Sequence, residues 1–220
     1  MLKEHKSIRS QKQNCPLCQQ ESHVFYQYKD RLYHQCKNCL GIFVDTELLP
    51  SPKEEVFRYE EHENNVEDKG YQKFVSPITK AILNKYKPKH IGLDFGGGTG
   101  PVISKVLKDH DYQIKIYDPF FHNYPELLSS KYDYIACCEV MEHFHFPEKE
   151  FDLLKNLLLE NGTLYCLTDI YSEKIDFHKW YYKNDPTHVF IYQKETLEWI
   201  KENIGFSKME INGRQISFFL

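Results

Sequence analysis

Long hydrophobic runs are absent from the sequence. No stretch approaches the roughly 20 apolar residues that a membrane-spanning helix requires. Residues 1–14 contain no apolar segment of the kind that secretory signal peptides carry. We therefore expect a protein without a membrane span that stays in the cytoplasm.

A basic excess is lacking as well. The 28 Lys and Arg residues are outnumbered by 32 Asp and Glu, which gives a formal net charge of -4. Proteins that neutralise nucleic-acid phosphates usually carry a basic excess or a basic stripe. Only the N-terminal tail approaches one, with Lys3, Lys6, Arg9 and Lys12. We interpret this tail as a solvated end and expect a small-molecule substrate rather than nucleic acid, while the oligomeric state stays unknown.

The length and composition indicate one domain of ordinary size with a small appendage. The chain has 220 residues, of which 41% are hydrophobic and 15% aromatic. This composition allows a sizeable core and excludes disorder as the dominant state. A change of composition near Pro50 suggests two units, a tail and small module over residues 1–50 and a larger domain over residues 51–220.

Four of the seven cysteines fall in two pairs with the spacing Cys-x-x-Cys. They are Cys15, Cys18, Cys36 and Cys39. The spacer of residues 19–35 is long enough for a β-hairpin, with alternating patterns over 23–28 and 31–35. In a reducing compartment, matched pairs at this spacing favour a zinc ribbon over disulfides. A thiol redox pair is the alternative, but two matched pairs favour a closed structural zinc site.

From His90 onward the chain alternates short apolar strands with helical patterns, which predicts a doubly wound α/β sheet. One strand runs directly into a glycine-rich loop, where missing Cβ atoms let a ligand approach the backbone. A dinucleotide-binding fingerprint fails there, because Pro101 stands where the third glycine belongs. What remains is Asp94-x-Gly96-x-Gly98-x-Gly100.

This pattern resembles motif I of the class I S-adenosylmethionine-dependent methyltransferases. Three strings also resemble those of a bacterial group of zinc-ribbon methyltransferases, similar to quinol O-methyltransferases: Leu-Asp-Phe-Gly-x-Gly-x-Gly-Pro at 93–101, Tyr-Asp-Pro-Phe-Phe at 117–121 and Asp-Pro-Thr-His-Val at 185–189. The resemblance implies a Rossmann-like sheet with a terminal antiparallel strand, and S-adenosylmethionine as cofactor with S-adenosylhomocysteine as product. The short segment 119–131 implies that the usual helix and edge strand there are much reduced.

The second strand of the domain ends in Asp118, where the doubly wound fold places a carboxylate on ribose hydroxyls. A simple turn at Asp118-Pro119 is the alternative. The resemblance implies a larger cofactor-binding set, which consists of Tyr71, Asp94, Phe95, Gly96, Gly97, Gly98, Gly100, Tyr117, Asp118, Pro119, Phe120, Cys138, Glu139 and Val140. Upstream, Tyr59, His62 and Tyr71 are candidate lid residues or else part of a solvated helix face.

Candidate catalytic residues follow the third strand and recur near the aromatic segment 177–190, which we expect to form a lid. They are Glu142, His143 and His188. We expect Glu139, Glu142 and His143 to share one side of a helical turn. With His188 this set is similar to the magnesium-binding residues of small-RNA 2'-O-methyltransferases, which implies a possible Mg²⁺ site. An acid or base role for either histidine and a purely structural role are the alternatives.

The resulting functional prediction is methyl transfer from S-adenosylmethionine to a small or medium-sized acceptor, with a hydroxyl as the favoured group. One alternative is an RNA or protein methyltransferase whose zinc ribbon holds the polymer, although residues 54–67 are acidic rather than basic. The other is a non-enzymatic binding module on a retained scaffold, which the intact glycines and Asp118 disfavour.

Overall fold

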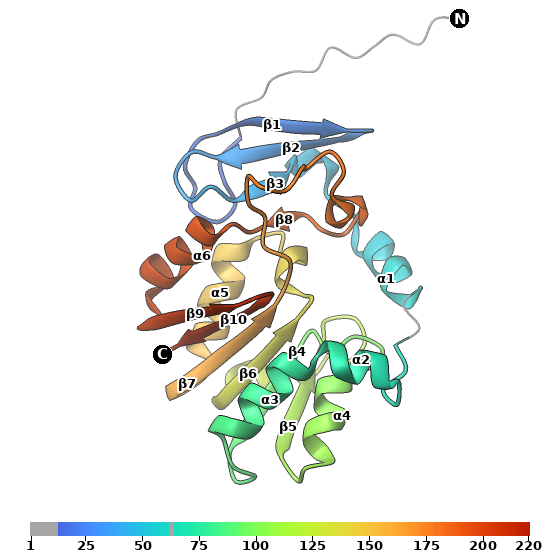
Figure 1. Ribbon diagram of the computed structural model, residues 1–220, viewed down its shortest axis with the longest axis vertical. Helices are drawn as coiled ribbons and strands as arrows, with labels where there is room; N and C mark the ends of the chain where they lie inside the picture. Colours follow the sequence, from blue (N-terminus) through green and yellow to red (C-terminus); the bar gives the residue numbers. More distant parts are fainter. Residues whose placement is uncertain (1–12, 62–63) are drawn as a thin grey trace, which may run out of the picture.

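The computed structural model describes residues 13–61 and 64–220. The basic N-terminal tail and the candidate lid residue His62 therefore lie outside the described part of the chain. Two sheets organise the rest, a small one at one end of the molecule and a large one that fills its body (Figure 1). Within the described ranges no helix combines the length and the apolar character needed to cross a bilayer.

The large sheet has six strands in the order β5-β4-β6-β7-β10-β9. Their bounds are β4 (Ile91–Phe95), β5 (Gln113–Tyr117), β6 (Tyr132–Cys138), β7 (Leu158–Leu167), β9 (Lys208–Asn212) and β10 (Gln215–Phe219). Strands β5, β4, β6 and β7 are parallel, whereas β10 runs antiparallel to both β7 and β9. The predicted Rossmann-like sheet with a terminal antiparallel strand is confirmed.

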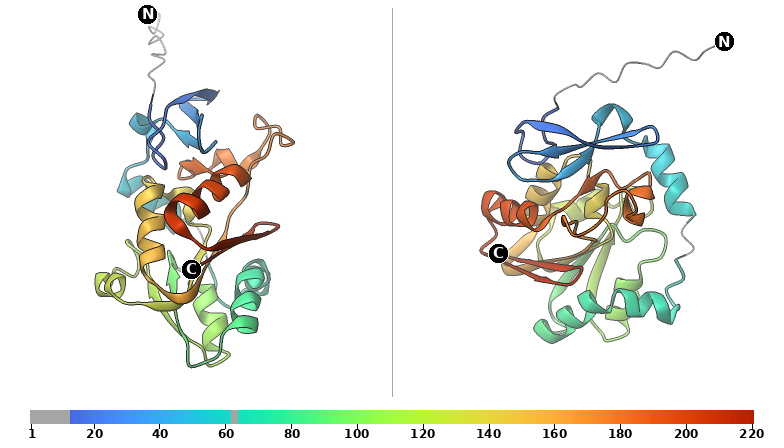
Figure 2. Two further views of the ribbon diagram at one scale, coloured as in Figure 1. Left: turned by 90° about the vertical axis from the view of Figure 1, so that its left-hand side faces the viewer. Right: turned by 45° about the horizontal axis from the view of Figure 1, so that its top comes forward.

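Helices cover both faces of this sheet, because the central strands are apolar on both sides. One face packs against α2 (Lys69–Phe74), α3 (Ser76–Lys85) and α4 (Val102–Lys108), and the other against α5 (Pro147–Asn156) and α6 (Lys194–Ile200) (Figure 2). Strand β6 shows the alternation directly: Tyr134 and Ala136 join the first core, whereas Ile135 and Cys137 join the second.

The connection between β5 and β6 is short, as the sequence predicted. It contains a single short 3-10 helix, η2 (Pro125–Ser129), in place of a full helix and a further strand. Strand β5 therefore forms the edge of the sheet, and the loop after Asp118 folds over the carboxyl ends of β4 and β5.

The small sheet has the order β1-β2-β3-β8 and is antiparallel throughout. Its strands are β1 (Ser22–Tyr28), β2 (Arg31–Cys36), β3 (Ile42–Val44) and β8 (Phe190–Ile191). The predicted hairpin is confirmed, with Lys29 at positive φ in its turn. Strand β8 comes from the larger unit, so this sheet extends across the boundary expected near Pro50.

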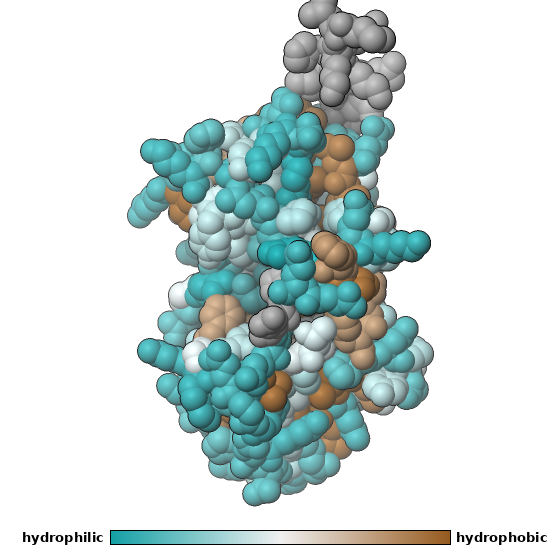
Figure 3. Space-filling view, turned by 90° about the vertical axis from the view of Figure 1, so that its right-hand side faces the viewer, coloured by the Kyte–Doolittle hydropathy of each residue, from teal (hydrophilic) through white to brown (hydrophobic). Residues whose placement is uncertain are grey.

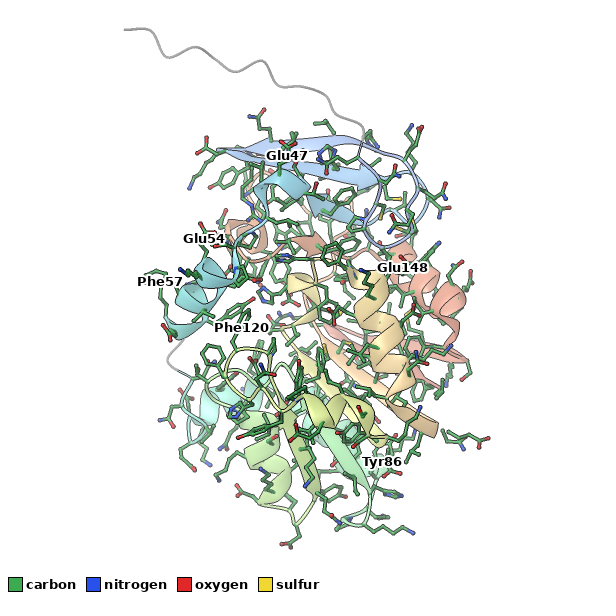
Figure 4. All side chains as sticks on the ribbon, turned by 180° about the vertical axis from the view of Figure 1, so that it is seen from behind. Glu47, Glu54, Phe57, Tyr86, Phe120 and Glu148 are labelled. Atoms are coloured by element: carbon green, nitrogen blue, oxygen red, sulfur yellow. The ribbon has the colours of Figure 1, made fainter. Side chains whose placement is uncertain are left out.

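Helix α1 (Pro52–Glu60) links the two units along one side of the molecule, after a short 3-10 helix, η1 (Thr46–Leu48). It begins with a capping box between Ser51 and Glu54, which satisfies two backbone N–H groups at its start. Hydrophilic residues cover most of the side that carries α1 and α2, with apolar residues exposed in the middle (Figure 3). In Figure 4, Phe120 lies below α1, on which Phe57 is labelled.

Candidate functional site

The four paired cysteines form one buried cluster beside the small sheet, with the first pair before β1 and the second at the end of β2 and in the turn that follows it. The Sγ atoms of Cys15 and Cys39 are 3.5 Å apart, and those of Cys18 and Cys36 are 3.3 Å apart. All four sulfurs lie within 4.8 Å of one another. A tetrahedral zinc ion with bonds of about 2.3 Å requires sulfur separations of about 3.8 Å, so a small expansion accommodates the ion. The cluster fits a structural zinc site, in which the protein fills every coordination position.

A cavity of about 600 Å³ opens at the carboxyl ends of the parallel strands. This volume is in the range of small-molecule sites, and the place is where doubly wound sheets bind ligands. Most of the predicted cofactor-binding residues line it, namely Tyr71, Phe95, Gly96, Gly97, Gly98, Tyr117, Asp118, Pro119, Phe120, Cys138, Glu139 and Val140. His143 and His188 line the same cavity, as does Tyr59 from α1.

Asp118 is fixed to the glycine loop by its own side chain. Its Oδ2 accepts a hydrogen bond from the Gly98 N–H at 2.9 Å, and its Oδ1 accepts from the N–H groups of Phe120 and Phe121 at 2.9 and 3.0 Å. Gly98 has φ +59°, and a Cβ added there would meet nothing within 4 Å. Open space in front of this glycine and a carboxylate at the end of β5 suit the ribose end of a nucleoside cofactor.

Two residues of the predicted cofactor set support the loop without lining the cavity. Asp94 is 4% exposed, and its Oδ2 accepts from the N–H and Oγ–H of Ser104 at the start of α4. Burial raises the pKa of Asp94 to about 6. A Cβ on Gly100 would lie 2.1 Å from the backbone oxygen of Asn64, so the close approach of two chain segments requires glycine there.

The two histidines face each other with ring centroids 5.0 Å apart. Their Nδ1 atoms lie 2.8 Å from backbone oxygens, that of His143 from Thr187 and that of His188 from Tyr182. A carbonyl accepts and does not donate, so the network assigns the proton to Nδ1 and leaves each Nε2 as an acceptor. Burial lowers the pKa of both, that of His188 to about 3, so both imidazoles are neutral at pH 7.

Glu142 is fully buried behind the histidines, in the 3-10 helix η3 (Met141–His143). Its Oε1 accepts from the Tyr182 hydroxyl at 2.7 Å, and its Oε2 accepts from the Thr168 hydroxyl at 3.0 Å. Burial raises the pKa of Glu142 to about 7. Glu142 is not among the residues that line the cavity.

The expectation that Glu139, Glu142 and His143 share one side of a helical turn is wrong. Glu139 precedes η3 with φ +51°, and both of its oxygens accept from Nη2 of Arg214 at 2.8 and 2.9 Å. Burial, reinforced by the nearby Glu142, raises the pKa of Glu139 to about 8.

Three of the four residues in the expected magnesium set do converge. One ligand atom each of Glu142, His143 and His188 lies within 4.8 Å of the others. Two imidazoles and one carboxylate depart from the oxygen ligands that Mg²⁺ prefers. The structure therefore gives no support to a magnesium ion at this place.

Two charged cavity residues, Arg214 and Asp185, have partners that the sequence did not indicate, although Asp185 itself begins the string at 185–189. Arg214, at the start of β10, lines the cavity and pairs through Nε with Asp169 at 2.5 Å. Asp185 also lines it and accepts two hydrogen bonds from Arg58 of α1 at 2.9 and 3.0 Å. The residues of each pair are 45 or more positions apart in the chain, so no local sequence pattern predicts these contacts.

The aromatic segment expected as a lid divides between two environments. Phe177 and Trp180 are buried in a cluster with residues of β2 and β3, beneath the small sheet. Tyr181 and Tyr182, in the 3-10 helix η4 (Tyr181–Asn184), line the cavity. This segment therefore joins the small sheet to the cavity wall instead of simply covering the cofactor cleft.

Comparison with known proteins shows the family of this chain. The profile of a family described as methyltransferase domain matches residues 68–211, well over half of the chain, so the chain belongs to that family of methyltransferases. None of the curated proteins matches the chain significantly.

Several solved structures are similar to part of the chain at low sequence identity. An O-methyltransferase family protein from Burkholderia thailandensis has 11% identity and a TM-score of 0.49, with 67% of this chain and 56% of that chain covered. A SAM dependent methyltransferase from Archaeoglobus fulgidus has 20% identity and a TM-score of 0.49, with 63% and 71% covered. The structure of PigF with SAH has 14% identity and a TM-score of 0.46, with 74% and 60% covered.

Proposed function

We propose that the chain transfers a methyl group from S-adenosylmethionine to a hydroxyl group of a small or medium-sized acceptor. The observation that carries the proposal is one cavity that holds both the glycine loop with Asp118 and two neutral imidazoles with free Nε2 atoms. The first set suits the methyl donor. The second suits the removal of a proton from the acceptor.

The residues around the glycine loop hold the cofactor in this proposal. Asp118 takes the ribose hydroxyls with acceptor capacity left over from its backbone hydrogen bonds. Phe120, Cys138, Tyr71 and Glu139 line the cavity. In this proposal the first two would border the adenine and the last two the methionine part of the cofactor. S-adenosylmethionine, when bound, supplies an electrophilic methyl group on a sulfonium ion. The protein then has to align the acceptor and exclude water.

The histidines provide the acid–base chemistry that a hydroxyl acceptor needs. A neutral Nε2 of His188 or His143 would accept the hydroxyl proton while the acceptor oxygen bonds to the methyl carbon, and the electron pair of the broken S–C bond would stay on the sulfur of S-adenosylhomocysteine. The carbonyl on each Nδ1–H keeps the imidazole in the orientation that presents Nε2. Glu142 helps to position His188 indirectly. Its carboxylate accepts a hydrogen bond from the hydroxyl of Tyr182, and the backbone oxygen of Tyr182 accepts one from Nδ1–H of His188.

The cysteine cluster holds zinc in this proposal and takes no part in the chemistry. Its four positions are filled by Cys15, Cys18, Cys36 and Cys39, so no position remains open for substrate. A small acceptor is preferred to a polymer, because the cavity is bordered by Glu139, Asp118 and Asp185 and not by a basic track.

The experiment compares His188→Ala with His110→Ala, which changes an exposed histidine at the end of α4. Radiolabelled S-adenosylmethionine is offered with a panel of phenols, alcohols and amines. We expect His188→Ala to bind S-adenosylhomocysteine normally and to lose about 100-fold or more in turnover, as removal of a general base does. Turnover equal to that of the wild type would contradict the role of His188. Transfer to amines alone would contradict the hydroxyl acceptor.

A further inference from the structure

We infer that the small sheet sets the position of the catalytic histidines, and that Arg31 is the positioning residue through which it acts. The inference rests on the proposed function for the role of His188. None of residues 13–49 lines the cavity, so any effect of this sheet on catalysis has to pass through other residues.

A continuous run of backbone hydrogen bonds joins the cysteine cluster to His188. Strand β3 begins three residues after Cys39 and pairs with β8, which begins two residues after His188. Ile42 lies opposite Ile191, and Phe43 opposite Phe190. Figure 1 shows β8 beside β3, as the strand of the small sheet that lies toward the large sheet.

Side chains reinforce this junction. The ring of Phe190 packs on Gly41, where an added Cβ would lie 2.4 Å from the ring. The amide of Gln193 donates to the backbone oxygen of Leu40 at 2.6 Å. Both contacts fall on the two residues that follow Cys39, so the second cysteine pair is the part of the cluster that touches the larger unit here.

Val189 ties the same junction to the other histidine. Its backbone oxygen accepts from the N–H of Val44, and its own N–H donates to the backbone oxygen of Glu142, both at 2.9 Å. Glu142 is the neighbour of His143 in η3. Backbone hydrogen bonds therefore connect β3 to the segments that carry His188 and His143, so the position of β3 affects the positions of both imidazoles.

Arg31 makes the most direct contact. From β2 its guanidinium donates to three backbone oxygens of the loop that carries the histidine: to Asp185 at 2.7 Å, to His188 at 2.9 Å and to Lys183 at 3.4 Å. Tyr33 of the same strand also donates to the Lys183 oxygen, at 3.0 Å. Arginine presents five N–H donors in a rigid planar fork, whereas lysine offers three on a compact ammonium at the end of a flexible stem.

The loop is held from a second side by α1. Arg58 binds the carboxylate of Asp185, whose other oxygen accepts from the N–H and hydroxyl of Thr187. These hydrogen bonds lower the pKa of Asp185 in spite of its burial. The backbone oxygen of Thr187 in turn fixes His143. Arg31 and Arg58 thus both hydrogen-bond to the loop of residues 183–188. Backbone oxygens of this loop and of Tyr182 orient His143 and His188.

A displacement of about 1 Å at a catalytic group is enough to reduce a rate about 100-fold. Removal of the Arg31 guanidinium takes one donor from each of three loop carbonyls and loosens the loop on the side of the small sheet. The Lys183 oxygen keeps the Tyr33 hydroxyl and the Asp185 oxygen keeps the N–H of His188, so the largest loss falls on the backbone oxygen of His188. The glycine loop and Asp118 are untouched by this change. The expected result is a protein that still binds the cofactor and turns over slowly.

The test compares Arg31→Met with Lys37→Met in the zinc-loaded full chain. Lys37 is an exposed cation of the same small unit that pairs with Glu21 at the surface, so both variants lose one positive charge. We measure zinc content, affinity for S-adenosylhomocysteine by calorimetry, and the imidazole resonances of His188 and His143 by NMR, with exposed His110 as the internal reference. Kinetics with S-adenosylmethionine follow for any acceptor that the wild type methylates.

For Arg31→Met we expect one zinc per chain, an affinity within about twofold of the wild type, shifted or broadened His188 and His143 signals, and kcat lower by about 10- to 100-fold with little change in the KM of the donor. In a His188→Ala background, Arg31→Met should then cost little more, since both changes act on one step. Lys37→Met should match the wild type throughout.

Unmoved histidine signals together with normal kcat in Arg31→Met would overturn the inference and leave the proposed function standing. Loss of zinc or of folding in Arg31→Met with normal behaviour of Arg31→Lys would overturn it too, because it would show a need for charge alone. Absence of any methyl transfer by the wild type would contradict the proposed function. The NMR comparison would still test whether Arg31 holds the loop.

Discussion

Replacement of Asp118 by alanine is the sharpest perturbation of the cofactor site. The carboxylate accepts three backbone N–H groups and is 6% exposed, so its removal takes an acceptor from Gly98, Phe120 and Phe121 and removes the proposed ribose contact. A hydrogen bond to a charged group contributes about 1.5–3 kcal/mol. Loss of one such contact to the cofactor therefore raises Kd by about 10- to 150-fold, because about 1.4 kcal/mol is a factor of ten.

Calorimetry with S-adenosylhomocysteine measures this loss, and zinc content reports whether the cysteine cluster stays intact. Asp152→Ala is the matched control, because Asp152 is an exposed carboxylate on α5 outside the cavity. Gly98→Val is an independent test, since a β-branched side chain at φ +59° is strained and projects into the open space. An Asp118→Ala protein that binds within twofold of the wild type would refute the assignment of the ribose site.

Three further results are expected. Metal analysis should find about one zinc per chain and none in a Cys15→Ser, Cys36→Ser double variant, so retained zinc would contradict the four-cysteine site. Urea unfolding of Gly41→Ala should show a loss of about 1–3 kcal/mol, because the new Cβ overlaps the buried ring of Phe190; full stability would argue against the packing of β3 on β8. Because the pKa of His188 is lowered to about 3 in the folded protein, the neutral imidazole stabilises the fold fully above pH 6.5, and this stabilisation is lost as the pH falls toward 3. Between pH 7.5 and 5 the free energy of unfolding of the wild type should fall by about 2 kcal/mol more than that of His188→Gln. Equal losses in the two proteins would disprove the effect of burial on this histidine.

The parts of the structure that the sequence predicted are those with local causes. The glycine loop follows β4 within a few residues, and Asp118 ends the next strand, so strand pattern and residue type locate the cavity together. The cysteine cluster could also be predicted from local sequence, because two Cys-x-x-Cys pairs at the ends of a hairpin bring their four sulfurs together. The short connection after Asp118 likewise indicated that the usual helix and edge strand there are much reduced, and β5 is indeed the edge of the large sheet.

The parts that the sequence did not predict depend on contacts between distant segments. The sequence spacing suggested that Glu139, Glu142 and His143 lie together on a helical turn. In the structure Glu139 has a positive φ and pairs with Arg214, 75 positions away, so it is separated from Glu142 and His143. The pairing of β3 with β8 and the contacts of Arg31 with the His188 loop span about 150 residues. A two-residue strand such as β8 is too short to produce a periodic pattern. Its place is decided by the partner strand alone.

The central claim is that this methyltransferase binds S-adenosylmethionine in the cavity at the ends of β4, β5 and β6. Isothermal titration of the zinc-loaded protein with S-adenosylmethionine and with S-adenosylhomocysteine tests it most directly, with NAD as a control. We expect micromolar binding of both ligands and none of NAD. A folded, zinc-containing protein that binds neither ligand would contradict it.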